Sequence, residues 1–274
     1  MAPAPDIEKQ PAISIRDVVV SYGGRRVLDG INLEIRRGET MVLLGGSGSG
    51  KSTLLRQIIG LEQPQSGQVL VDGIDPARSR PSDLKKLRRS IGVAFQNAAL
   101  FNSMSLEDNI ALPLREHTRL AESTIELITW MKLALVGLAE FRKFNPQELS
   151  GGMKKRAAVA RALALDPEIL VFDEPSAGLD PIVAAELDEL ILALKRYFHI
   201  TVVVVTHEMA SAFRIADRMA MLYQGSLIAV GTKEELRAST HPRIRQFFDR
   251  VPDDLIAADK FDNFLQGYLE GSLK

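Results

Sequence analysis

The chain has 274 residues, 46% hydrophobic and 25% charged, which is typical of one large globular domain or of a domain with a subdomain. Its 34 Lys and Arg residues nearly balance its 35 Asp and Glu residues, so bulk basic charge does not favour nucleic acid, and we expect no nucleic-acid partner. It has no cysteine, which excludes disulfides and cysteine metal sites, and no apolar run reaches the about 18 residues of a membrane span.

The first part of the chain is predicted to be a loose arm followed by short strands. Residues 1–12 contain three prolines and no signal-peptide core, so we expect a flexible arm on a cytosolic chain whose membrane role depends on a partner. The segments after the arm are rich in β-branched residues and are interrupted by a turn at Gly23-Gly24. The predicted strands cover residues 13–20, 27–35, 41–44 and 68–73.

The run that follows the strand at 41–44 is predicted to bind the phosphates of a nucleotide. It fits the pattern G-x-x-x-x-G-K-[ST], and a helix-compatible stretch from Ser52 to Ile59 follows. Glycines let successive N–H groups point at phosphate oxygens, and the start of the helix adds its positive dipole end. Lys51 can reach the β- and γ-phosphates, and the Ser52 hydroxyl can ligate Mg²⁺. The loop consists of Gly45, Gly46, Ser47, Gly48, Ser49, Gly50, Lys51, Ser52 and Thr53.

The remainder of the chain is predicted to alternate helices and apolar strands. From Pro81 to about Leu165 the pattern is helical, with breaks predicted at Pro113 and at Asn145-Pro146. Strands are then predicted at 169–172 and 201–205, a helix at 181–197, and short strands and turns over 218–229. We therefore expect a parallel α/β core that is preceded by an antiparallel sheet and interrupted by a helical insertion.

Two adjacent acids end the strand at 169–172. A buried strand has little reason to end in Asp173 and Glu174 unless a cation or a substrate meets them. Asp173 is placed to hold Mg²⁺, while Glu174 faces the other way and can polarise a water aimed at the γ-phosphate. The alternative is an ordinary strand end capped by solvated acids.

Two further features complete the predicted site. His207 follows the strand at 201–205 and can hydrogen-bond a γ-phosphate, although for a histidine in isolation an ordinary polar strand end is the favoured interpretation. The loop Leu149–Met153 opens a helix with Ser150 as a good cap, so its free N–H groups form a second anion site, or simply a capped helix start. In a parallel sheet the strand ends before Lys51, Asp173 and His207 should converge on one site.

In their order along the chain these motifs resemble those of ABC-transporter ATPase subunits over about residues 13–240. The resemblance implies the α/β fold of a P-loop NTPase, with a parallel-sheet core, an N-terminal antiparallel β-subdomain and an inserted α-helical subdomain at about 97–160. It implies that Asp173 is the Walker B acid, that Glu174 is the catalytic glutamate and that His207 is the switch histidine.

The same resemblance assigns further residues. It implies that Gln96 is the glutamine-loop ligand of Mg²⁺, that Asp180 lies in the D-loop, and that Tyr22 stacks on adenine. It also implies that the loop Leu149, Ser150, Gly151, Gly152 and Met153 is the signature, which contacts the ATP of a second copy. Met153 departs from the usual glutamine, and a thioether cannot donate the hydrogen bond of an amide. The Ser150 hydroxyl and the helix-start amides remain, so we expect a functional signature.

A narrower resemblance comes from the segments 97–105 and 111–118 together with Met153. They look like the ATPases of MCE-type lipid transporters, the Mla-like phospholipid systems. This implies an ATP-hydrolysing, energy-coupling subunit at the cytoplasmic face of the bacterial inner membrane. Its implied partners are a second copy in an ATP sandwich, integral membrane permease subunits, an MCE-domain lipid-binding protein and a small accessory subunit.

Other functions remain open at this stage. One is the ATPase of an importer for amino acids or another small solute, whose cassette would look nearly the same. Another is a soluble, non-transport ABC protein, and a simple P-loop kinase is a more distant alternative. In the C-terminal extension, residues 241–274, the side chains Phe261, Phe264, Leu265, Tyr268 and Leu269 follow the spacing of one apolar helix face. That face is expected to dock on its own domain or on the second copy.

Overall fold

The structure is a computed structural model that describes residues 10–251, 266 and 268. The chain divides into two compact units, residues 1–236 and 237–274. The second unit contains the helix α9 (Pro242–Phe248), whose first turn is capped by the side chain of His241. Phe261, Phe264, Leu265 and Leu269 of the predicted apolar stripe lie outside the described residues. Among the described helices, none combines the length and the apolar content needed to cross a bilayer.

A six-stranded sheet forms the centre of the first unit, in the order β5-β6-β7-β3-β8-β9. The strands β5 to β8 of this order run parallel, and β9 pairs with β8 in the antiparallel sense. The strands β3 and β7 are buried along their whole length, as their unbroken apolar sequences predict for strands covered on both faces. The bounds are β3 Thr40–Leu44, β5 Ile91–Ala94, β6 Ile169–Asp173, β7 Thr201–Val205, β8 Arg218–Tyr223 and β9 Ser226–Thr232.

A second, antiparallel sheet has the order β2-β1-β4. Its strands are β1 (Ile13–Tyr22), β2 (Arg25–Ile35) and β4 (Ser66–Val71), and the predicted Gly23-Gly24 turn joins the first two. Its inward side chains share one hydrophobic core with α1 (Lys51–Ile58) and with the central sheet. The predicted α/β fold, with an antiparallel sheet before a parallel core, is confirmed.

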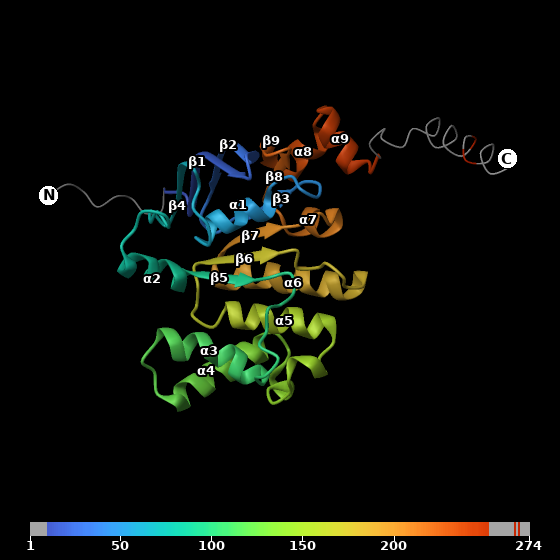
Figure 1. The fold of residues 1–274 in the computed structure, drawn as a ribbon. Helices are drawn as coiled ribbons and strands as arrows, with labels where there is room; N and C mark the ends of the chain where they lie inside the picture. Colours follow the sequence, from blue (N-terminus) through green and yellow to red (C-terminus); the bar gives the residue numbers. More distant parts are fainter. Residues whose placement is uncertain (1–9, 252–265, 267, 269–274) are drawn as a thin grey trace. The chain divides into compact units, whose positions relative to one another are not determined.

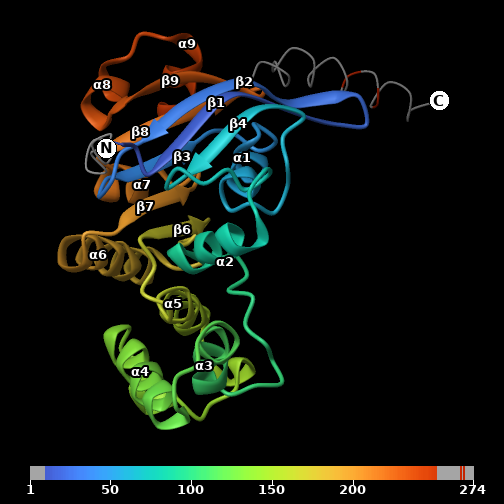
Figure 2. The ribbon, with the colours of Figure 1, turned by 90° about the vertical axis from the view of Figure 1, so that its left-hand side faces the viewer.

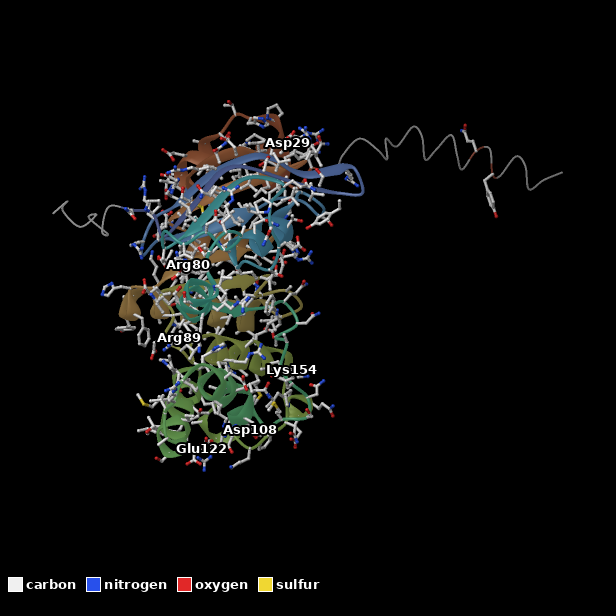
Figure 3. All side chains as sticks on the ribbon, turned by 60° about the vertical axis from the view of Figure 1, so that its left-hand side comes forward. Asp29, Arg80, Arg89, Asp108, Glu122 and Lys154 are labelled. Carbon is white, nitrogen blue, oxygen red and sulfur yellow. The ribbon has the colours of Figure 1, made fainter. Side chains whose placement is uncertain are left out.

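The helical insertion lies at the end of this unit far from the β2-β1-β4 sheet (Figures 1 and 2). It contains α3 (Leu106–His117) and α4 (Glu122–Leu135), two single 3-10 turns and then α5 (Gly151–Ala162). Figure 3 shows Lys154 of α5 between the central sheet and the helices that carry Asp108 and Glu122. The remaining helices are α2 Pro81–Ser90, α6 Pro181–Phe198, α7 Met209–Ile215 and α8 Lys233–Ala238.

The predicted helical stretch from Pro81 to Leu165 was wrong in two details. It contains the strand β5, which pairs with β6 at the edge of the central sheet. Pro113 does not break a helix, because α3 continues through it for another turn and ends at His117. The predicted break at Asn145-Pro146 is present as a 3-10 turn before α5.

Candidate functional site

The strands β6, β7 and β3 are neighbours in the central sheet, so the residues after their carboxyl ends lie at one edge. Asp173 stands opposite Val205 in the register of β6 and β7. His207 follows β7 by two residues, and the loop 45–53 follows β3 directly. The three groups that the sequence places at strand ends are therefore brought together, at the edge where parallel sheets bind ligands.

The loop 45–53 is shaped by Gly45 and Gly50, which no other residue could replace without strain. Gly45 has φ 150°, and a Cβ built there would lie 2.4 Å from the carbonyl oxygen of Leu222. Gly50 has φ 106°, and its Cβ would lie 2.8 Å from the carbonyl oxygen of Val27. These close approaches hold the loop between β2 and β8, and Gly50 leads into the first turn of α1.

Lys51 is held inside this loop. Its Nζ donates hydrogen bonds to the carbonyl oxygens of Gly45 (2.7 Å) and Gly46 (2.9 Å). Burial lowers the pKa of the Lys51 ammonium, while the nearby carboxylates of Glu174 and Asp173 act in the opposite direction. Around it, the exposed loop residues are Gly46, Ser47, Gly48 and Ser52, and the buried ones are Gly45, Ser49, Gly50 and Thr53.

The paired acids differ in surroundings, as the sequence suggests. Burial, and then the neighbouring Glu174 carboxylate, raise the pKa of Asp173. Glu174 has a left-handed backbone, φ 48°, and its N–H still bonds the carbonyl of Val205 at 2.8 Å. The ammonium of Lys155, on α5, donates to the Glu174 carbonyl at 2.9 Å. Sequence reasoning missed Lys155, because the run Lys154-Lys155-Arg156 does not show which cation faces the strand end.

His207 meets Glu174 across 33 positions of sequence. Its Nδ1 lies 2.9 Å from Glu174 Oε1, and its other ring nitrogen lies 3.7 Å from a carboxylate oxygen of Glu208. The Glu174 side chain is 12% exposed and that of His207 is 56% exposed. The Glu174 carboxylate occupies Nδ1, so Nε2 is the ring atom left to face a ligand.

The Ser150 loop opens α5 as a capped helix start. Ser150 Oγ accepts from the Met153 backbone N–H at 3.2 Å, so the residue that departs from the usual glutamine contributes its main chain to the cap. A Cβ on Gly152 would lie 2.6 Å from Val183 Cγ1, which explains a glycine where α5 meets α6. In the described part of the chain, no hydrogen bond joins this loop to residues 45–53.

The remaining predicted residues lie around this edge. Asp180 caps α6, accepting from the N–H groups of Ile182 and Val183 at 3.0 and 3.1 Å. Gln96 is exposed two residues beyond β5, whose pairing with β6 brings it to the Asp173 edge of the sheet. Tyr22 ends β1, is 45% exposed as a residue, and donates from its hydroxyl to Glu62.

The oxygen-bearing side chains at this edge of the sheet fit a magnesium ion that is shared with a bound phosphate. Ser52, Gln96 and Asp173 supply hydroxyl, amide and carboxylate oxygens, the hard ligands that Mg²⁺ prefers. Residues 10–251 contain no cluster of three or more His, Asp or Glu side chains that could hold a metal unaided. The raised pKa of Asp173 reflects a carboxylate that is buried at some cost, which a divalent cation would offset.

The fold and this edge define a nucleoside triphosphatase of the P-loop class, with a glycine-shaped loop, a buried lysine and acids at the next strand ends. A sequence profile of the ABC transporter family matches residues 28–177, and the chain belongs to this family. As a member it binds and hydrolyses ATP, and the resemblance to ABC-transporter ATPases is confirmed.

Two groups of curated relatives are similar over most of the chain. The "Probable ribonucleotide transport ATP-binding protein mkl" of Mycobacterium leprae is 44% identical over 238 residues, which cover 87% of this chain and 69% of that protein. The "Intermembrane phospholipid transport system ATP-binding protein MlaF" of Escherichia coli K12 is 43% identical over 242 residues, which cover 88% of this chain and 90% of that protein.

Solved structures agree with the fold. A dimeric structure of the ATP-binding cassette MJ0796 in a post-hydrolysis state, bound to ADP and Pi, has a TM-score of 0.74 and 32% identity. The match covers 80% of this chain and 98% of that one. The structure of cbiO1 from Clostridium perfringens, part of the transporter complex cbiONQ, has a TM-score of 0.77 and 30% identity, covering 88% of this chain and all of that one.

Proposed function

We propose that this ATPase is the energy-coupling subunit of a transporter that moves phospholipid or a related lipid between membranes through an MCE-type complex. The similarity to MlaF supports the cargo, because the chain spans 90% of that protein. The proposal places the chain at the cytoplasmic face of the inner membrane, held there by integral membrane permease subunits, with an MCE-domain protein and a small accessory subunit as further partners.

The observation that carries the proposed chemistry is the contact between Glu174 and His207 beside Lys51. Glu174 accepts the proton of the attacking water, and Lys51 holds the β- and γ-phosphates in a loop whose carbonyls already bind its ammonium. His207 faces Glu174 with Nδ1 and donates to the γ-phosphate from Nε2, and serving both anions needs a hydrogen on each ring nitrogen. A bound Mg²⁺, held by Ser52, Gln96 and Asp173, would neutralise charge on the phosphates.

Two copies are proposed to meet head to tail, so that each ATP lies between Lys51 of one copy and Ser150 of the other. ATP then favours closure by binding the closed dimer more tightly than the open one. Shifting that equilibrium from 1:99 to 99:1 needs a differential affinity of about 5.5 kcal/mol, which two ATP molecules share. Hydrolysis removes the ATP that favours the closed dimer, and the helical insertion moves the permease.

The variant Glu174→Gln tests the chemistry. It should still bind ATP but lose at least about 100-fold in kcat, the lower end of the contribution of a positioned base, and should accumulate closed dimers with ATP. Glu208→Gln is the matched control, because that carboxylate also lies near His207 but contacts its other nitrogen at 3.7 Å. Turnover at the parent rate in Glu174→Gln would refute the assigned base.

The cargo is tested by what co-purifies with the chain from detergent-solubilised membranes. Permease subunits with bound phospholipid support the proposal. The mkl relatives carry a ribonucleotide transport name, so a permease complex that binds a ribonucleotide or an amino acid, and no lipid, would replace it with solute import.

A further inference from the structure

The turn that contains Gln96 has an unusual backbone. Ala98 and Ala99 are adjacent, and both have left-handed conformations, with φ 57° and 50°. A Cβ disfavours this region, which is why glycine or asparagine normally occupies it. The Ala98 N–H bonds the carbonyl of Phe95 at 2.9 Å, so the two alanines and Gln96 belong to one turn. Some other group must hold this turn in place.

That group is Arg161, near the end of α5. Its Nη1 donates to the carbonyl of Ala99 at 2.6 Å and its Nη2 to the carbonyl of Ala98 at 2.9 Å. Burial lowers the pKa of Arg161, and among the described residues no ion pair links it to a carboxylate. Arg161 is half-buried, and its guanidinium donates to the carbonyls of two residues with strained backbones, so it holds their turn in place.

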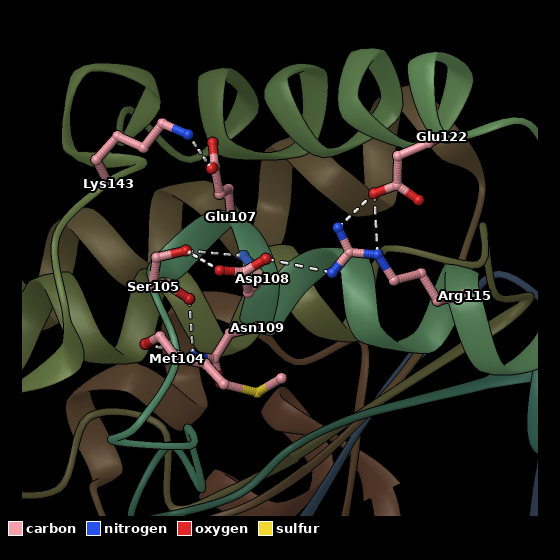
Figure 4. A network of polar contacts seen from close by, with 8 residues as sticks. All are labelled: Met104, Ser105, Glu107, Asp108, Asn109, Arg115, Glu122 and Lys143. Carbon is pink, nitrogen blue, oxygen red and sulfur yellow. Dashed lines mark hydrogen bonds and ion pairs between the residues drawn. The ribbon is translucent and has the colours of Figure 1, made fainter.

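The other end of the segment is fixed as well. Asn109 of α3 is fully buried and donates from Nδ2 to the carbonyls of Phe101, Met104 and Ser105. Its Oδ1 accepts from the Phe101 N–H at 2.7 Å. Figure 4 shows this side chain beneath the start of α3, beside Met104 and Ser105. Asn109 therefore holds the segment after Phe101, and Arg161 is the side chain that holds the carbonyls of Ala98 and Ala99.

The helix that carries Arg161 begins at Ser150. Its 12 residues, Gly151–Ala162, span about 18 Å at the usual rise. The rigid helix α5 therefore carries the signature loop at its first turn. In its last turn it carries Arg161, which holds the turn that contains Gln96. A shift of α5 when Ser150 meets a nucleotide would be transmitted directly to that turn.

We propose that Arg161 is a positioning residue for hydrolysis: it holds the strained Ala98-Ala99 turn and so fixes Gln96 relative to the nucleotide. The inference rests on the proposed role of Gln96 as a ligand of Mg²⁺. This positioning role of Arg161 can be distinguished from a general packing role in α5 by one property. Arg161 is needed only because alanine disfavours the conformation, so glycine at Ala98 and Ala99 should make it dispensable.

The test uses the full chain, whose lack of cysteine permits a single labelled site. A spin label on Asn97→Cys, an exposed position beside Gln96, should become more mobile when Arg161→Met is added. Without the label, Arg161→Met should lower kcat about tenfold, with a higher Mg²⁺ requirement and unchanged ATP affinity. Arg156→Met, which removes another part-buried arginine from α5, is the matched control and should change neither readout.

A rescue experiment distinguishes a positioning role of Arg161 from a packing role. Adding Ala98→Gly and Ala99→Gly to Arg161→Met should restore kcat to within about twofold of the parent. An immobile label in Arg161→Met, or a triple variant no better than Arg161→Met, overturns the inference. A mobile label with unchanged kcat also overturns it, and leaves the proposed base and the proposed cargo untouched. Should Arg161→Met fail to fold, Arg161→Lys with and without the two glycines gives the same comparison.

Discussion

At Glu174 the chain leaves the central sheet through a left-handed residue, and this conformation costs about 1–2 kcal/mol. Two contacts hold it there. The N–H still bonds Val205, and the carbonyl receives Lys155 from α5. The side chain then meets His207, which the sequence places 33 positions away. The strain at Glu174 thus accompanies a precise placement of the proposed base.

A second buried acid, Asp188, predicts a dependence of stability on pH. Asp188 is 4% exposed, one oxygen accepts from Ser211 at 2.9 Å, and the other has no partner. Burial raises its pKa above the ordinary 3.8, so the folded chain binds more protons than the unfolded chain just above that pH. The stabilisation from this group is complete below pH 3.8 and is lost as pH rises through the folded-state pKa.

Asp188→Asn should therefore stabilise the chain at pH 7.5 by about 1 kcal/mol, because a neutral amide costs less to bury than a carboxylate. The gain should shrink toward zero as the pH falls toward 4. Urea unfolding at both pH values measures it. Glu189→Gln, which removes an exposed acid next in sequence, should change the free energy of unfolding by less than about 0.5 kcal/mol. A destabilised Asp188→Asn at pH 7.5 would contradict the prediction.

Among the elements, α3 and β5 show where sequence patterns fall short. Proline inside a helix costs about 3 kcal/mol, yet α3 passes through Pro113. The stripe Leu106, Ile110 and Leu114 is buried, and each such side chain contributes about 1.5–3 kcal/mol, which outweighs the proline. β5 has four residues and follows α2 without a turn, so only its pairing with β6 identifies it as a strand.

In the site, too, local sequence patterns predict some features, and contacts between distant segments determine others. The loop 45–53, the paired acids and the Ser150 cap are local in sequence, and residue spacing predicts them. Lys155 and Arg161 act on backbone carbonyls of distant segments, so nothing in their own neighbourhood reveals them. A periodic pattern reports which face of a helix is apolar, but it does not report which carbonyl a polar side chain on that helix will reach.

Asn109→Ala tests whether α3 holds the segment after Gln96 through this one side chain. The change leaves the Met104 carbonyl and the Phe101 N–H without their partner, while the carbonyls of Phe101 and Ser105 keep a backbone donor each. Two buried groups left unpaired should cost about 3 kcal/mol of unfolding free energy. The exposed Asn102→Ala, in the same segment, should cost less than about 0.5 kcal/mol. Urea unfolding measures both, and a loss below 1 kcal/mol in Asn109→Ala would show that other contacts hold the segment.

For the whole molecule, the two anion sites of one chain need not serve the same nucleotide. Lys51 lies in a loop after β3 and Ser150 opens α5, and no described hydrogen bond joins the two loops. The dimeric structure of MJ0796 shows that a relative with 32% identity pairs. If the sites are shared between copies, defects in Lys51 and in the signature should complement each other.

Lys51→Ala and Gly151→Asp make this test possible. Gly151 lies in the first helical turn with room for a side chain, since a Cβ would lie 3.7 Å from Leu179 Cδ2. An aspartate there favours the helix but repels phosphate. Each variant alone should be nearly inactive. A 1:1 mixture should regain about a quarter of the parent ATPase rate, because half the dimers are mixed and each has one intact site. Mixing Lys51→Ala with Glu174→Gln should regain nothing, because both residues belong to the same half of the site. A first mixture as inactive as its components would mean that Lys51 and Ser150 of two copies do not share one ATP.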